Sequence, residues 1–261
     1  MARYPVLLLK PGRETHIKNR HHAIYSGAVD GKIGDALTGS IVEVRAHDGT
    51  FLCYATVNSR AYIALRVVSF EEGDPLAVIR RNIKRAIELR ETLVPSSDST
   101  AVRLVNAEGD AVPGLIVDRY GDVVVMQLTT LGMDRLRPWF CDPLRELCPP
   151  AAIFEKTAGP GRKKEGLEPR EGWTWGKGEE TILVEERGLK FNIRLTGSQK
   201  TGLFLDQREM RSLVRSLAAG RTVLDCCSYV GGFALSALAG GGGAAGAGDY
   251  APHAPPPPPG H

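Results

Sequence analysis

Residues 221–233 read RTVLDCCSYVGGF, and this stretch predicts the opening unit of a nucleotide-binding α/β fold. Residues 221–225 form a short strand that ends in an acidic residue, a turn follows at residues 229–232, and a helix is expected over residues 233–238. The two glycines of the turn let the backbone approach a ligand closely. The N-terminus of the following helix presents unpaired amide groups to that ligand.

The glycine pattern of this turn narrows the class of ligand. A dinucleotide fingerprint needs G-x-G-x-x-G, whereas residues 228–233 contain two adjacent glycines only. The turn therefore offers no wide cradle for a pyrophosphate and favours a sulfonium nucleoside, which carries no phosphate. Asp249 follows Gly232 by 17 residues, where a second strand would end. A carboxylate there is placed to accept hydrogen bonds from the two hydroxyls of a ribose.

The first 70 residues predict a small β-barrel module. Residues 40–45 and 51–57 read as two strands joined by an Asp-Gly hairpin signal, and residues 63–70 read as a third strand. A helix follows up to residue 93, with Asp74 as its N-cap and Pro75 at its first position. Its apolar positions are separated by basic residues, which predicts an amphipathic helix with a cationic face.

A second β-rich region follows this helix. Strands are expected at residues 101–105, 123–128 and 151–155, with turns at 113–114 and 120–122, a helix at 131–147 and an exposed loop at 159–178. A hairpin is expected at residues 181–193, and a helix leads from residue 207 to Gly220. This helix then connects to the strand at residues 221–225.

Composition is that of an ordinary globular protein, with 43% hydrophobic and 24% charged residues. Nothing in the sequence resembles a secretory signal or a bilayer-spanning stretch, so we expect a cytoplasmic location and no membrane partner. The five cysteines lack the spacing of a disulfide framework or a zinc site. We therefore expect reduced, mostly buried thiols and no bound metal, with Cys226 and Cys227 packed behind the turn.

Basic residues are clustered, although the net charge is only +3. Such clusters concentrate positive potential where a phosphate backbone could lie, and the alternative is a solvated charged face. The candidate RNA-binding residues come from the first two clusters: Arg13, Lys18, Arg20, Arg80, Arg81 and Lys84. A third cluster consists of Arg162, Lys163, Lys164 and Arg170.

Two spaced motifs carry a family resemblance. Residues 199–208 read QKTGLFLDQR and residues 223–233 read VLDCCSYVGGF, and both resemble the bacterial 5-methylcytosine methyltransferases of large-subunit ribosomal RNA. These are class I methyltransferases with an N-terminal PUA domain. Within the two motifs the match fails only at Cys227, where the family has Phe. Residues 9–14, 25–29, 103–110 and 113–120 resemble earlier parts of the family, so that the likeness covers roughly residues 5–239.

The resemblance implies a donor pocket for S-adenosyl-L-methionine and large-subunit rRNA as the partner. Residues that would line or shape this pocket are Lys200, Thr201, Phe204, Asp206, Gln207, Arg208, Asp225, Ser228, Tyr229, Gly231, Gly232, Phe233 and Asp249. Structural alternatives remain for four of them. Asp206 is a candidate helix cap, Phe204 and Phe233 are candidate core residues, and Arg208 is a candidate surface residue.

The resemblance also implies a fold and its domains. We expect an α+β and then α/β chain: a PUA-like β-barrel at 1–72, a central α/β domain at 73–188 and the start of a Rossmann-like class I methyltransferase domain at 189–239. Residues 240–261, rich in Gly, Ala and Pro, are expected to be a disordered tail. Because the later D-P-P and cysteine motifs of the family are missing, we expect an incomplete, inactive domain, ended by truncation or a frame shift. No catalytic residue is assigned, and the sequence leaves the oligomeric state open.

Two other functions remain open. A non-catalytic RNA-binding module would keep the PUA-like and central domains and use the same basic clusters. A nicotinamide-dependent oxidoreductase would use the strand-turn-helix unit, but the missing G-x-G-x-x-G argues against it. RNA binding and methyl transfer, measured on the same chain, separate the first alternative from a methyltransferase.

Overall fold

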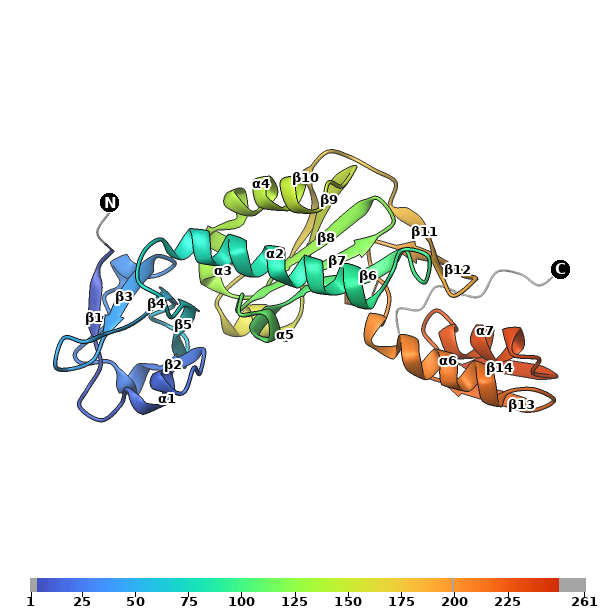
Figure 1. Cartoon of the computed structure of the whole chain (residues 1–261), viewed down its shortest axis with the longest axis horizontal. Coiled ribbons are helices and arrows are strands. Elements are labelled where there is room, and N and C mark those ends of the chain that lie inside the picture. Colours follow the sequence, from blue (N-terminus) through green and yellow to red (C-terminus); the bar gives the residue numbers. More distant parts are fainter. Residues whose placement is uncertain (1–3, 199, 249–261) are drawn as a thin grey trace.

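The computed structural model describes residues 4–198 and 200–248, which form an elongated molecule with the N-terminal sheet at one end and the C-terminal helices at the other (Figure 1). The N-terminal sheet has the strand order β1-β3-β4-β5-β2. Its strands are β1 (Val6–Leu8), β2 (Ala23–Tyr25), β3 (Ile41–Arg45), β4 (Phe51–Val57) and β5 (Ile63–Ser69). Short helical segments connect them: α1 (Thr15–Lys18), η1 (Ser26–Ala28) and η2 (Asp35–Leu37). The three predicted strands β3, β4 and β5 are confirmed.

Helix α2 (Pro75–Leu93) joins this sheet to the central region (Figure 1). The Asp74 side chain accepts a hydrogen bond of 3.0 Å from the amide of Leu76, as the predicted cap requires. Ile79 and Ile83 are fully buried against the central core. Ala86 and Ile87 are buried as well, and Arg81, Lys84 and Arg85 are exposed, which agrees with the expected amphipathic pattern except at the exposed Leu89 and Leu93.

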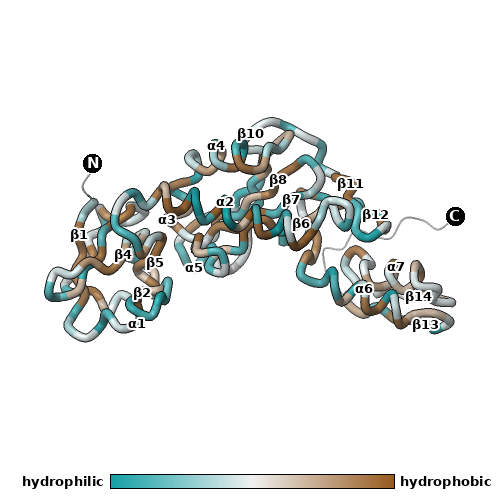
Figure 2. The backbone as a smooth tube through the Cα atoms, in the orientation of Figure 1, coloured by the Kyte–Doolittle hydropathy of each residue, from teal (hydrophilic) through white to brown (hydrophobic). Residues whose placement is uncertain are grey.

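The central sheet has the strand order β10-β9-β8-β7-β6, and only β8 and β9 run parallel to each other. It consists of β6 (Ala101–Asn106), β7 (Leu115–Tyr120), β8 (Val123–Leu128), β9 (Ala152–Thr157) and β10 (Arg170–Trp175). Figure 2 shows hydrophobic segments along its middle strands. The associated helices are η3 (Ala107–Asp110), α3 (Leu131–Arg135), α4 (Arg137–Leu147) and α5 (Pro160–Lys164).

Three expectations for the central region are wrong. Strand β7 was missed between the two predicted turns, although its pattern is largely apolar and buried. The single helix expected at residues 131–147 is two helices, because α3 ends at Arg135 and Pro138 lies in the first turn of α4. The exposed loop expected at residues 159–178 contains α5 and β10, and β10 completes the sheet by pairing with β9.

The C-terminal region begins with the predicted hairpin of β11 (Thr181–Glu186) and β12 (Leu189–Arg194). It continues with η4 (Leu205–Gln207), α6 (Arg208–Leu217), β13 (Thr222–Cys226), α7 (Gly232–Ala239) and β14 (Ala244–Gly248). The strand-turn-helix unit expected at residues 221–238 is confirmed as β13 and α7. Helices α6 and α7 pack against each other, and β14 contacts α7.

The expectation of disorder after residue 239 is wrong for residues 240–248. Strand β14 pairs in parallel with β13, from Thr222 opposite Ala244 to Cys226 opposite Gly248. Small side chains do not prevent this pairing, because a parallel ladder is formed by backbone groups. Asp249 and the proline run lie outside the described residues. In the described parts of the chain, no helix is long and apolar enough to cross a membrane.

The N-terminal sheet is fixed to the central region by a buried carboxylate, that of Glu165. Its Oε2 accepts 2.8 Å from the Asn58 side-chain amide, and its Oε1 lies 2.8 Å from Arg66 Nη2. Beside it, a Cβ built on Gly132 would lie 2.2 Å from Cβ of Thr56, so the backbone of α3 is in direct contact with β4. Polar and steric contacts together hold the two regions in one orientation.

Candidate functional site

The turn between β13 and α7 is held by its own backbone and by Asp225. Gly231 adopts the left-handed conformation with φ of 71°, and a Cβ built on it meets no atom within 4 Å. The Gly231 amide donates 2.8 Å to the carbonyl of Ser228, and Ala234 donates 3.1 Å to Oδ2 of the buried Asp225. The first intrahelical bond of α7 runs from Leu235 to Gly231, so the amides of Gly232 and Phe233 have no partner within the helix.

The motif at residues 199–208, called the second motif from here on, lies directly against this turn. Tyr229 donates a hydrogen bond of 2.9 Å from its hydroxyl to the carbonyl of Gly202. Its ring meets that of Phe204 edge to face, with 5.6 Å between the ring centroids. The structure therefore brings the segments at residues 200–208 and 225–233 together, although neither pattern by itself predicted a contact.

Lys200 and Asp206 lie at the open side of this contact. The ammonium of Lys200 is 4.1 Å from the centroid of the Phe204 ring and 3.9 Å from Oδ2 of Asp206. Asp206 is exposed and makes no capping bond to α6, so its alternative role as a helix cap is not seen. Phe204 and Phe233 are half-buried, as are Gln207 and Ser228.

Thr201 and Arg208 point away from the turn and into the protein. The fully buried Thr201 donates 2.5 Å to Oδ2 of Asp118 and bonds to the Tyr120 hydroxyl at 2.9 Å. Arg208 is also buried, and its Nε donates 3.2 Å to Glu186, so it does not face solvent. Both side chains tie the second motif to the central region.

Burial changes the acidity of two groups near this motif. It raises the pKa of Tyr120, whose hydroxyl is enclosed between Thr201 and Leu203. It also lowers the pKa of Lys156 to about 8, since this ammonium is buried on β9 with the Ser198 hydroxyl as its hydrogen-bond acceptor. The Ser198 bond joins Lys156 to the loop that leads into Lys200.

The expectation that Cys226 and Cys227 pack behind the turn is wrong. Both side chains are exposed, and Cys227 has a φ of 60°. At this position the family pattern has Phe, and the left-handed backbone of Cys227 directs its side chain outward. Of the other cysteines, Cys53 and Cys148 are buried, and burial raises the pKa of the Cys53 thiol to about 12. Within residues 4–198 and 200–248, no cluster of His, Cys, Asp or Glu could hold a metal ion.

The candidate RNA-binding residues differ in how far acids neutralise them. Arg13 is exposed, and the guanidinium of exposed Arg20 lies 4.9 Å from the centroid of the Phe70 ring. Acidic partners are present for Lys18 (Glu14), Arg80 (Glu146), Arg81 (Glu71) and Lys84 (Glu88). In the third cluster, Arg162 is buried and pairs with Asp134 at 2.7 Å. Arg162 is therefore a structural residue.

Sequence reasoning missed the buried residues that support the second motif. Glu186, Arg211, Asp118 and Tyr120 had no assigned role, yet their side chains contact residues 201–208. A weak signal existed for two of them. Glu186 ends a strand at a hairpin, and Arg211 occurs three residues after Arg208 on the same helix, where neighbouring side chains share a face.

The matches to protein families agree with this arrangement. Residues 7–70 match the family of PUA-like domains, and residues 165–253 match the family of S-adenosylmethionine-dependent methyltransferases. The fold and these matches define a chain with a PUA-like domain followed by a methyltransferase domain.

Curated relatives make the comparison more specific. The chain is homologous to ribosomal RNA large subunit methyltransferase I. It is 35% identical to that protein of Cronobacter sakazakii over 238 residues, which are 90% of this chain and 60% of the relative. It is 36% identical to that of Vibrio vulnificus over 237 residues, again 90% and 60%. The chain thus spans about three fifths of the length of these relatives.

Solved structures show the same fold. A protein of Streptococcus mutans, described as a SAM-dependent methyltransferase, superposes with a TM-score of 0.79 and 24% identity over 96% of this chain and 64% of its own. A methyltransferase structure in complex with SAH gives the same values.

Proposed function

We propose that the turn between β13 and α7, together with residues 200–207, binds S-adenosyl-L-methionine for methyl transfer to ribosomal RNA. The observation that carries this proposal is the contact of Tyr229 with Gly202 and Phe204, which makes one site of the two motifs. The open space at Gly231 and the free start of α7 fit a ligand that brings a carboxylate and a ribose but no phosphate.

The residues divide into three roles in this proposal. The amides at Gly232 and Phe233 bind the methionyl carboxylate, Gly231 gives the turn its left-handed backbone, and Asp225 holds that turn in place through Ala234. Phe204 and Tyr229 exclude water from one side of the ligand, with Lys200, Asp206, Gln207 and Ser228 at its margin. Asp249 binds the ribose hydroxyls. When bound, S-adenosyl-L-methionine supplies an activated methyl group on its sulfonium sulfur.

RNA binding belongs to the other end of the molecule. We propose that the PUA-like domain binds large-subunit rRNA through Arg13, Lys18 and Arg20, with Arg80, Arg81 and Lys84 of α2 extending the same cationic surface. The curated relatives are named for large-subunit rRNA, which supports this partner and with it a cytoplasmic location. The proposed target atom is carbon five of a cytosine.

The 261 residues assayed alone are proposed to bind the donor without turnover. Carbon five of cytosine is a poor nucleophile, so a thiolate must first add to carbon six. Cys226 ends β13 and Cys227 follows it in the donor turn, so neither is assigned this role. A non-catalytic RNA-binding module is the second candidate function, favoured by the exposed Arg13 and Arg20 of the PUA-like domain.

Calorimetry of the chain with S-adenosylmethionine and, separately, with NADH tests the ligand. We expect saturable binding of the first only, and binding of NADH in its place would support an oxidoreductase. Tritium transfer from labelled S-adenosylmethionine to unmethylated large-subunit rRNA tests turnover. Labelled carbon five of cytosine would disprove the proposal that this chain is inactive. Retention of RNA binding without donor binding would favour the RNA-binding module.

A further inference from the structure

Arg211 of α6 contacts both segments of the proposed donor site. The guanidinium Nη1 donates 3.0 Å to the carbonyl of Phe204, and the side chain is 3% exposed. A Cβ built on Gly232 would lie 3.1 Å from Cδ of Arg211, so the aliphatic part of this side chain lies against the start of α7. One arginine therefore supports the Phe204 backbone and the glycine turn at the same time.

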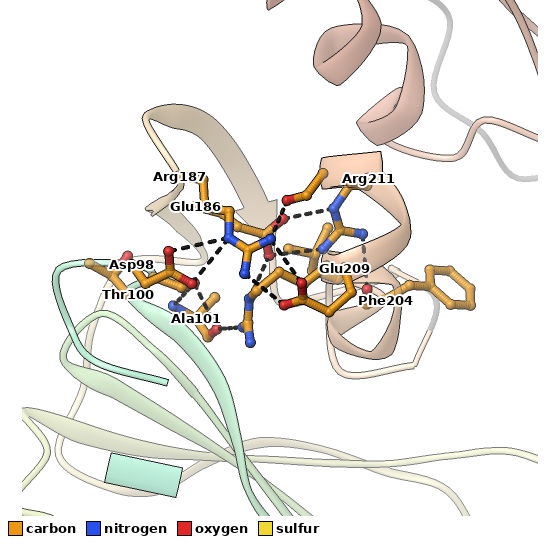
Figure 3. A network of polar contacts seen from close by, with 12 residues as sticks. Asp98, Thr100, Ala101, Glu186, Arg187, Phe204, Glu209 and Arg211 are labelled. Atoms are coloured by element: carbon orange, nitrogen blue, oxygen red, sulfur yellow. Dashed lines mark hydrogen bonds and ion pairs between the residues drawn. The ribbon is translucent and has the colours of Figure 1, made fainter. Parts of the chain in front are cut away.

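Glu186, the last residue of β11, determines where Arg211 lies. Its carboxylate accepts 2.8 Å from Nε and 2.9 Å from Nη2 of Arg211, and 3.2 Å from Nε of Arg208 (Figure 3). Glu186 is only 4% exposed, so both of its oxygens are committed to these two guanidinium groups. A bidentate pair of this kind fixes orientation as well as distance.

A second group of ion pairs lies next to the buried cluster of Glu186, Arg208 and Arg211. Arg187 bonds to Asp98 at 3.2 Å and to Glu209 at 2.7 Å, which connects the hairpin to both the central region and α6 (Figure 3). The hydrogen bonds to Glu209 raise the pKa of Arg187, because they favour its charged form. Arg215 of α6 adds a bond of 2.8 Å to the Arg187 carbonyl.

We propose that Glu186, acting through Arg211, is a positioning residue for the methyl-donor site. It fixes the Phe204 backbone and the start of α7 relative to the central region, so that the donor turn is already formed before a ligand arrives. This inference rests on the proposed function for the identity of the ligand. The positioning itself is a property of the free protein and is tested separately.

The test compares Glu186→Gln and Arg211→Lys with the unaltered full chain. Gln keeps the size of the side chain but gives up the charge, and Lys keeps the charge but gives up the two-pronged geometry. Asp110→Asn is the matched control, because Asp110 of η3 forms a half-buried pair of 2.6 Å with Arg90 of α2. Hydrogen exchange without ligand and calorimetry with S-adenosylmethionine are measured for each.

In Glu186→Gln and Arg211→Lys we expect faster exchange at residues 202–207 and 228–236, with β8 and β9 unchanged, and about tenfold weaker S-adenosylmethionine binding. Asp110→Asn is expected to alter neither. Unchanged exchange in these segments would overturn the positioning role, whatever the affinity. Absence of binding in the unaltered chain would instead refute the proposed function, and exchange alone then decides the positioning role. If Glu186→Gln does not fold, Arg211→Lys makes the same comparison.

Discussion

Thr201 illustrates how single buried hydroxyls hold the second motif in place. We expect Thr201→Val to lower the free energy of unfolding by about 1–3 kcal/mol, because it leaves Oδ2 of Asp118 without its 2.5 Å donor in a buried site. Urea denaturation measures this loss. Thr201→Ser, which keeps the hydroxyl, is the control and is expected to lose much less. A loss in Thr201→Ser with none in Thr201→Val would show that the methyl group, and not the hydrogen bond, stabilises this position.

Lys156 predicts a dependence of stability on pH. Its folded pKa of about 8 lies below the usual 10.5, so the unfolded chain binds more protons between these values and stability rises as pH increases through that window. We expect Lys156→Met to raise the free energy of unfolding at pH 7 by about 1–3 kcal/mol, and this advantage to shrink toward pH 10. Denaturation of both proteins at pH 7 and pH 9.5 checks this. An advantage independent of pH would contradict it.

The behaviour of a residue could be predicted from the sequence where it depends only on residues nearby in the chain. The turn at Gly231 was predictable because its positive φ and the start of α7 depend on neighbours within ten residues, whereas the donor-binding roles of Gly231 and Asp225 stay predictions. Thr201 and Arg208 were assigned to the pocket but are bonded to Tyr120 and Ala101, which lie 81 and 107 positions away. The hydrophobic periodicity of a single sequence gives no information about hydrogen-bond partners so far apart in the chain.

At the scale of elements, some glycines in the C-terminal region are required because a larger side chain would clash with a neighbouring element. The low complexity of this segment hides that requirement in the sequence. A Cβ on Gly240, where α7 ends, would lie 2.0 Å from the carbonyl oxygen of Arg215 in α6. We expect Gly240→Ala to force α6 and α7 apart and to lower the free energy of unfolding by about 1–3 kcal/mol. Thermal denaturation measures it. Gly243→Ala is the control, since its Cβ meets no atom, and an equal loss there would refute the steric explanation.

Elements with a clear local pattern were predicted well, and those defined by distant partners were not. Strand β3 alternates between more and less buried positions, and helix α2 has the capping Asp74 directly before its first residue. Strand β14 lacks β-branched side chains and exists because β13 offers it a parallel backbone ladder. Strand β10 likewise depends on β9 and was read as a loop.

On the scale of the whole molecule, exposed apolar side chains gather in the C-terminal region: Met210, Leu213, Leu217, Leu224, Leu235 and Leu238. We expect this chain to bind the dye ANS and to self-associate as its concentration rises. The double variant Leu217→Lys/Leu224→Thr should lower the ANS fluorescence by about half. Light scattering after size exclusion follows the association. Leu93→Lys, on exposed Leu93 of α2, is the control, and an equal effect there would mean that the patch is not responsible.

The fixed joint at Glu165 has a consequence for how an RNA would be selected. Helix α2 has 19 residues, about 28 Å, and it runs from the PUA-like domain toward the hairpin that carries Glu186. Because both ends of α2 are held in place, the distance between the PUA-like domain and the donor turn is fixed. An RNA bound at Arg13 and Arg20 would reach the donor turn only if its own fold covers that distance. The protein would then recognise the three-dimensional shape of the RNA around the target nucleotide more than the flanking nucleotide sequence.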